Sequence, residues 1–137
     1  GSIYGLLGPS GCGKTSAIRC ILGILKYASG TITFYGEKRQ ISGASVGYMP
    51  QETSLYQDIT AAETLHYFGS LYGMSRDAIQ QRTDFLLNFL NLSPQRNVFV
   101  QLLSSGQRRR VSLAAAMINR PPLLVLGKTP SYVSFSY

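Results

Sequence analysis

The chain alternates between short apolar runs and longer segments in which apolar residues recur every three or four positions. Three apolar runs, at residues 3–7, 46–49 and 123–126, have the length of strands in a buried parallel sheet. Residues 30–35 alternate between apolar and polar side chains and predict a further strand, which a polar connection follows. Both ends of the chain are therefore expected to contribute strands to one sheet.

Helical spacing fills much of the sequence between these runs. Residues 16–25 predict one helix shortly after the first run. Further along, Thr60 and Glu63 have the spacing of a capping box, and Ser75 can cap a second helix that ends before Pro94. The apolar stripes of these two helices are formed by Leu65, Phe68, Tyr72, Ile79, Leu86 and Leu90. The combination predicts an α/β fold with a helical insert.

A glycine-rich segment joins the first predicted strand to the first predicted helix. Residues 8–15 read Gly-Pro-Ser-Gly-Cys-Gly-Lys-Thr, which is the spacing of a phosphate-binding loop. Glycine permits a backbone that turns several amides inward, and the following helix adds the positive end of its dipole. Lys14 would then neutralise the terminal phosphates, and the Thr15 hydroxyl would bind Mg²⁺. The alternative is a glycine-rich turn that happens to precede Lys-Thr.

A second helix start carries the sequence Leu-Ser-Ser-Gly-Gln at residues 103–107. Ser104 and Gln107 have the spacing of a capping box ahead of the apolar-periodic residues 111–118. The free amides at that helix start would form a second anion site, far from the first in the sequence. As structure alone, the same segment is an ordinary helix cap.

Together the two segments resemble the nucleotide-binding domain of ATP-binding cassette (ABC) transporters. Residues 103–107 are similar to the signature motif of that family, with Ser105 in place of a glycine. Gln51 stands where that family has its Q-loop glutamine. Residues 48–52 and 67–74 are further similar to the G/H-type transporters of eukaryotes. The resemblance implies an α/β fold with a P-loop NTPase (RecA-like) core and an α-helical signature subdomain, which we expect to be incomplete.

The same resemblance divides the chain into parts. It implies a partial nucleotide-binding domain at residues 1–126, with residues 1–50 and 119–126 in the α/β core. Residues 51–118 would form the helical part, which includes the Q-loop and the signature helix. Residues 127–137 depart from the family pattern and are expected to form a disordered tail. We expect the chain to be a fragment truncated at both ends.

The resemblance also implies residues that bind ATP and Mg²⁺. Thr15 and Gln51 would bind the metal. The signature residues would contact the γ-phosphate held by a second ABC domain, because such domains close head to tail around two ATP molecules. Ser105 adds a Cβ atom at a close backbone approach, so weaker or altered closure is expected. The ATP-binding residues implied are Gly8, Pro9, Ser10, Gly11, Cys12, Gly13, Lys14, Thr15, Ser16, Gln51, Ser104, Ser105, Gly106 and Gln107.

Hydrolysis is where the chain departs from this family. The family follows the strand at residues 123–126 with Asp-Glu, which supports Mg²⁺ and polarises the attacking water, whereas this chain reads Gly127-Lys128. No carboxylate residue follows Asp84, and the single histidine, His66, lies in the helical insert and not at the position of the family's switch histidine. The chain as written is not expected to hydrolyse ATP, although its family does. Intron read-through or a frameshift would each explain the altered sequence.

Three functions stay open on the sequence. The first is ATP binding in an ATP-driven membrane transporter, with hydrolysis coupled to transport in the intact protein. The second is a non-catalytic nucleotide-binding fragment. The third is a soluble ABC protein of translation or DNA repair. A small-molecule kinase would not explain the signature segment.

Composition limits the partners and the location. The chain contains no run of about eighteen apolar residues, so neither a transmembrane helix nor a signal peptide is predicted. We expect the transmembrane partner to lie outside this sequence and the chain to act at the cytoplasmic face of a membrane. The net charge of +7 could suggest nucleic acid. Residues 108–110 fit the polar face of the signature helix instead, so no nucleic-acid partner is expected. Cys12 and Cys20 indicate a reduced compartment, since they fit no disulfide or zinc pattern.

Overall fold

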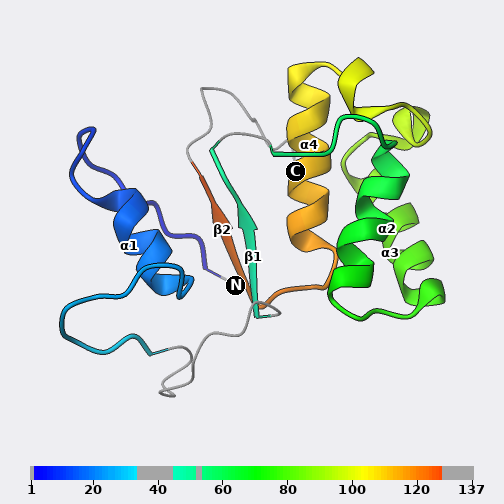
Figure 1. Cartoon of the computed structure of the whole chain (residues 1–137). Coiled ribbons are helices and arrows are strands. Elements are labelled where there is room, and N and C mark those ends of the chain that lie inside the picture. The colour runs from blue at the N-terminus through cyan, green and yellow to red at the C-terminus, as the bar shows by residue number, and fades with distance from the viewer. Residues whose placement is uncertain (1, 34–44, 52–53, 128–137) are drawn as a thin grey trace. The chain divides into compact units, whose positions relative to one another are not determined.

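The computed structural model describes residues 2–33, 45–51 and 54–127. The chain separates into two compact units, Gly1–Gly43 and Ala44–Tyr137. The first unit contains helix α1, and the second contains strands β1 and β2 together with helices α2, α3 and α4 (Figure 1). The tail at residues 128–137 and the polar connection at residues 36–43 lie outside the described residues.

Helix α1 (Lys14–Ile21) is the only α-helix described in the first unit. It begins directly after Gly13, which has a left-handed φ of 92°. It ends before Gly23, whose φ of 71° stops the helical backbone. The prediction of a helix at residues 16–25 is therefore right in kind, but the helix starts earlier and is shorter because glycines limit it on both sides.

The strand predicted at residues 3–7 is wrong, because this segment forms no regular structure. Ile3, Tyr4 and Leu7 are 94%, 91% and 91% exposed. An apolar run forms a strand only where a neighbouring strand takes up its amides and carbonyls. The strand predicted at residues 30–35 is likewise absent at residues 30–33, where Gly30 has a φ of 111°. Residues 34–35 lie outside the described part.

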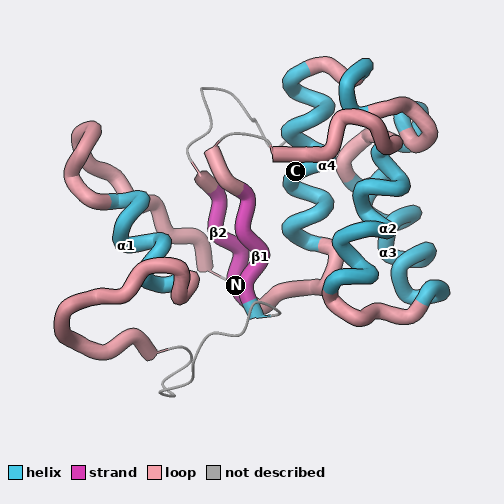
Figure 2. The backbone as a smooth tube through the Cα atoms, viewed as in Figure 1, coloured by secondary structure: helices cyan, strands magenta, loops and turns pink. Residues whose placement is uncertain are grey.

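The second unit is built on a parallel pair of strands. Strand β1 (Val46–Met49) pairs with β2 (Leu123–Leu126), and Val46 aligns with Leu123 (Figure 2). Both strands lie where the apolar runs predicted them. Gly47 in β1 has no room for a side chain, because a Cβ atom there would lie 2.0 Å from the Ala116 carbonyl oxygen of α4. Strand β1 therefore packs closely against the end of that helix.

Three helices connect the two strands and enclose the core. They are α2 (Ala61–Leu71), α3 (Arg76–Phe89) and α4 (Ser105–Met117), with short 3₁₀ helices at Ser93–Gln95 and Val100–Leu102 between the last two. The capping box predicted at Thr60 is confirmed, as is the Ser75 cap. Figure 1 shows α2 and α3 packed on the side of α4 that faces away from the strands. The core is formed by Leu65, Leu86, Leu87, Leu92, Val100, Val111 and Ile118.

Candidate nucleotide-binding site

The loop before α1 has the backbone of an anion-binding turn. Gly11 and Gly13 adopt left-handed φ angles of 80° and 92°, which a side chain would strain. At Gly8 a Cβ atom would lie 2.7 Å from the Cys12 Sγ atom, so the Cys12 side chain would have to rotate away. The conformation of the loop therefore needs glycine at positions 11 and 13, two of the three glycines that the sequence indicated.

Helix α1 starts with its first-turn amides open. No side chain caps this helix, and its first turn contains no acidic residue. The amides of Lys14, Thr15 and Ser16 have no hydrogen-bond partner among the described residues. Together with the helix dipole, such donors favour an anion. The residues present fit a phosphate group, and the assignment of individual ATP contacts stays a prediction.

The Lys14 ammonium group folds back over the loop. Its Nζ atom donates hydrogen bonds to the carbonyl oxygens of Gly8 at 2.7 Å and Pro9 at 2.6 Å, and lies 3.4 Å from the Cys12 Sγ atom. The positive charge is therefore held beside the loop by neutral carbonyl groups. Carbonyl oxygens are weaker partners for an ammonium group than phosphate oxygens, because the latter carry charge.

The signature segment forms the start of α4, as predicted. Ser104 Oγ accepts a hydrogen bond from the Gln107 amide at 3.2 Å, and Gln107 Oε1 accepts one from the Ser104 amide at 2.8 Å. The amides of Ser105 and Gly106 have no hydrogen-bond partner in the described part of the chain. A Cβ atom on Gly106 would meet nothing within 4 Å. Packing within this chain therefore gives no reason for glycine at that position.

Charges at the helix starts divide the four described α-helices into two pairs. The first turns of α2 and α3 contain Glu63 and Asp77. The first turns of α1 and α4 contain no acidic residue. Because a carboxylate in the first turn offsets the positive end of the dipole, α1 and α4 are the helices whose starts stay open to an external anion.

Gln51 and Gly127 follow β1 and β2, so both lie at the carboxyl ends of the two parallel strands. In open α/β sheets, ligands bind at such ends. The Gly127 amide donates to the Met49 carbonyl oxygen at 2.8 Å. A Cβ atom at position 127 would lie 2.6 Å from the Gln51 amide nitrogen and 2.9 Å from the Pro50 carbonyl carbon. Backbone therefore occupies the space in which the side chain of the family's aspartate would begin.

The three consecutive arginines of α4 form hydrogen bonds to backbone outside the helix, which the sequence did not predict. All three are half-buried. They donate to backbone carbonyl groups: Arg108 to Leu103 at 2.7 Å, Arg109 to Gly127 at 3.4 Å and Arg110 to Leu90 at 3.0 Å. The sequence predicted only which face of the helix they occupy. The acceptors of Arg109 and Arg110 lie 18 and 20 residues away along the chain, so sequence spacing could not identify them.

The metal site predicted from the sequence rests on Thr15 and Gln51. Thr15 belongs to the first unit and Gln51 to the second, and their shared role stays a prediction. Within residues 2–33, 45–51 and 54–127, no group of three or more His, Cys, Asp or Glu residues could hold a metal ion. In the same residues, none of the helices has both the length and the apolar composition needed to cross a bilayer.

A glycine loop that opens onto a helix start, followed by parallel strands and a helical insert, defines a P-loop NTPase of mixed α/β type. Residues 1–127 match the family model described as ABC transporter, so the chain belongs to the ABC transporter family. This confirms the family, the fold class and the ATP-binding role that the motifs predicted. The chain is thus an ATP-binding part of this family.

Several known proteins are similar over most of the chain. ABC transporter G family member 23 of Dictyostelium discoideum is 43% identical and covers 92% of this chain, which spans 18% of that relative. Nod factor export ATP-binding protein I of Cupriavidus pinatubonensis is 39% identical over 92% of this chain, which spans 40% of that relative. The first of these agrees with the predicted resemblance to G/H-type transporters.

A solved structure confirms the fold at lower identity. It is cbiO1 from Clostridium perfringens, described as part of the ABC transporter complex cbiONQ. The TM-score is 0.78 at 26% identity, and the match covers 88% of this chain and 51% of that chain. This chain thus spans between 18% and 51% of the length of these three proteins.

Proposed function

We propose that this chain binds Mg²⁺ and ATP through residues 8–16 and presents the start of α4 to ATP held by a second ABC domain. The observation that carries the proposal is the presence of two acid-free helix starts with open amides, at α1 and at α4. One chain with two such helix starts suits a head-to-tail pair of domains, in which ATP lies between the start of α1 in one domain and the start of α4 in the other.

At the first end, the amides of Lys14, Thr15 and Ser16 would bind phosphate oxygens. The Lys14 ammonium group would exchange the carbonyl oxygens of Gly8 and Pro9 for phosphate oxygens, which bind a cation more strongly. Mg²⁺, when bound, neutralises phosphate charge. The Thr15 hydroxyl and the Gln51 amide oxygen are the groups of this chain that would hold it.

At the second end, backbone groups would make most of the contacts. The side-chain oxygens of Ser104 and Gln107 each already accept a hydrogen bond from a backbone amide within the capping box. The Ser104 hydroxyl hydrogen and the amides of Ser105 and Gly106 would be left to donate to a phosphate oxygen. Gly106 would allow close approach, since it presents no Cβ atom.

We further propose that this chain does not hydrolyse ATP. In the described residues, the carboxyl end of β2 continues into Gly127, whose backbone lies against Pro50 and Gln51. Position 128 is a lysine. The side chains that in this family polarise the attacking water are therefore replaced by groups that accept no proton at neutral pH.

In the whole protein, ATP binding would drive transport through a transmembrane partner at the cytoplasmic face of a membrane. The names of the similar proteins support this, since one is an export ATP-binding protein and another is part of a transporter complex. No nucleic-acid partner is proposed, because residues 108–110 donate to carbonyl groups of the chain itself.

The first test measures ATP binding to the 137-residue chain in the presence of Mg²⁺. Lys14→Ala should weaken binding about tenfold or more, because a charged hydrogen bond is worth about 1.5–3 kcal/mol. Lys26→Ala is the matched control, since it removes one exposed lysine of the same unit outside the loop. Equal affinity of the two variants would contradict the first site. Phosphate release above the level of Lys14→Ala would contradict only the absence of hydrolysis.

The second test separates the cap of α4 from its proposed ligand. Ser104→Asn and Ser104→Asp should both retain the cap, because both side chains cap helices well. Only aspartate adds a negative charge where a phosphate is proposed. We expect ATP-dependent self-association, followed by sedimentation velocity, to persist with asparagine and to be lost with aspartate. The same association in both variants would count against a phosphate at this end.

A further inference from the structure

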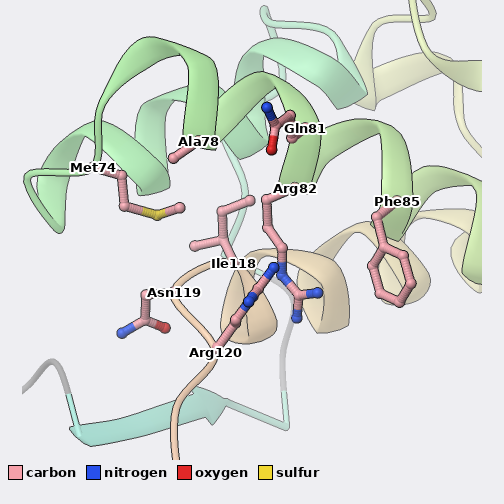
Figure 3. Close-up of a pocket in the computed structure, with 8 residues that line it drawn as sticks. All are labelled: Met74, Ala78, Gln81, Arg82, Phe85, Ile118, Asn119 and Arg120. Atoms are coloured by element: carbon pink, nitrogen blue, oxygen red, sulfur yellow. The ribbon is translucent and has the colours of Figure 1, made fainter.

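A cavity of about 630 Å³ lies between α3 and the turn that follows α4, inside the second unit (Figure 3). Its wall combines apolar side chains, including Met74, Phe85 and Ile118, with the guanidinium groups of Arg82 and Arg120. None of these residues belongs to the proposed nucleotide site. The cavity therefore needs a separate explanation.

Arg82 is held in place but retains an unused donor. Its Nη2 atom donates to the Met117 carbonyl oxygen at 3.1 Å. Its guanidinium carbon lies 4.9 Å from the centre of the Phe85 ring, which is a cation–π distance. Its Nε atom is buried and has no hydrogen-bond partner among the described residues. A buried donor without a partner costs free energy unless a ligand accepts its hydrogen.

Arg120 places a second positive charge beside the first. Its backbone has a φ of 54°, and its amide donates to the same Met117 carbonyl oxygen at 3.1 Å. Figure 3 shows its side chain reaching toward that of Arg82. Burial, and after it the charge of Arg120, lower the pKa of Arg82. The two cations thus repel each other at close range.

Nothing in the described residues neutralises this pair. The carboxylate of Asp84 on the same helix is taken by Arg96. Neither Arg82 nor Arg120 forms an ion pair with a described carboxylate. Two facing guanidinium groups present planar sets of donors that match the oxygens of a carboxylate or phosphate. A ligand that fits this cavity therefore has an anionic group for the two arginines and an apolar part for the remaining wall.

We propose that this cavity binds an organic anion, with a carboxylate or phosphate head between Arg82 and Arg120 and an apolar body against Met74 and Phe85. The volume lies within the range of about 300–1,000 Å³ that is usual for small-molecule sites. The ligand class follows from the wall, because an inorganic anion would leave the apolar side unused. A purely apolar ligand would leave both cations unpaired.

The test uses the full chain labelled with ¹³C at its methionine methyl groups and titrated with octanoate, octyl phosphate, inorganic phosphate and an acidic peptide. Met74 lines the cavity, whereas Met49 is buried in β1 and reports on the fold. We expect a saturable shift of the Met74 signal with octanoate or octyl phosphate, and a stationary Met49 signal. The two amphiphiles distinguish a carboxylate head from a phosphate head.

Three arginine variants complete the test. Arg82→Gln and Arg120→Gln should each weaken binding about tenfold or more, because each removes a charged hydrogen-bond donor. Arg76→Gln, an exposed change on the same helix outside the cavity, should leave affinity unchanged. If Arg82→Gln shifts the Met49 signal, that variant has disturbed the fold, and the affinity of Arg120→Gln, a change at an exposed residue, decides the test.

Four results would overturn the proposal. They are an unmoved Met74 signal, equal affinity in Arg120→Gln, an equal effect of inorganic phosphate, and binding of an acidic peptide in place of either amphiphile. An equal effect of inorganic phosphate would indicate a simple anion site, and binding of the acidic peptide would indicate a protein-binding surface.

Discussion

A single added methyl group is expected to stabilise the chain at one glycine and destabilise it at another. Gly106 is the second residue of α4, and a Cβ atom there would meet nothing within 4 Å. Glycine in a helix costs roughly 0.5–1 kcal/mol relative to alanine, because it loses more backbone freedom on folding. Gly106→Ala should therefore raise the free energy of unfolding by up to about 1 kcal/mol.

Gly47→Ala is the matched change with the opposite sign. The new Cβ atom would lie 2.0 Å from the Ala116 carbonyl oxygen and 2.7 Å from Pro121 Cγ. The first of these atoms is backbone at the end of α4, so β1 and the helix must move apart. Overpacking of this kind costs about 1–3 kcal/mol. Both variants replace one glycine by alanine, so they differ only in the space that surrounds the added methyl group.

Urea unfolding followed by circular dichroism measures both effects. With a slope of about 1.5 kcal/mol per M, Gly106→Ala should raise the midpoint by about 0.3–0.7 M and Gly47→Ala should lower it by about 0.7–2 M. Gly106→Ala should also weaken ATP-dependent self-association despite its greater stability. A lower midpoint for Gly106→Ala would refute the reasoning, because it would mean that this helix start is not open.

Two further pairs of variants test polar groups of the helices. Thr83 Oγ1 is buried without a hydrogen-bond partner among the described residues, whereas Thr64 Oγ1 donates to the Thr60 carbonyl oxygen at 2.9 Å. Thr83→Val should thus raise the free energy of unfolding in urea and Thr64→Val should lower it, by about 1 kcal/mol each. A change of the same sign in both variants would contradict this. The Thr60 backbone amide, and after it the Thr60 hydroxyl, lower the pKa of Glu63. Because the folded pKa lies below the unfolded value of about 4.3, this stabilisation is complete above that pH and is lost as the pH falls through the folded pKa. The difference in midpoint between the wild type and Glu63→Gln, measured from pH 7 to pH 3, should shrink toward zero at the acid end, and a constant difference would contradict this origin.

The elements predicted correctly are those whose signal is local. The capping boxes at Thr60 and Ser104 depend on residues three positions apart, and both form as expected. Strand β2 was predicted from an apolar run alone, and it forms because β1 lies beside it. The left-handed turns at Gly11 and Gly13 were also predictable, since glycine is the residue that adopts such φ angles without strain.

What the sequence missed depends on contacts between distant residues. Residues 3–7 have the composition of a strand but no strand forms there, and composition cannot supply a pairing partner. The close approach of Gly127 to Gln51 joins positions far apart in the chain. Arg82 and Arg120 face one cavity from two elements, and neither is part of a motif. Such features follow from packing, which a single sequence does not specify.

Binding and hydrolysis depend on different kinds of groups in this chain, and this explains how one can persist without the other. The proposed phosphate donors at α1 and α4 are mainly backbone amides, whose positions follow from glycine and from the caps. A change of side chain leaves such donors in place. Hydrolysis in this family needs the carboxylates that follow β2, and Gly127 and Lys128 stand in their place. The Gly127 amide still donates a hydrogen bond to the Met49 carbonyl oxygen and so extends the pairing of the two strands. We therefore expect ATP binding to persist in a chain that does not hydrolyse ATP.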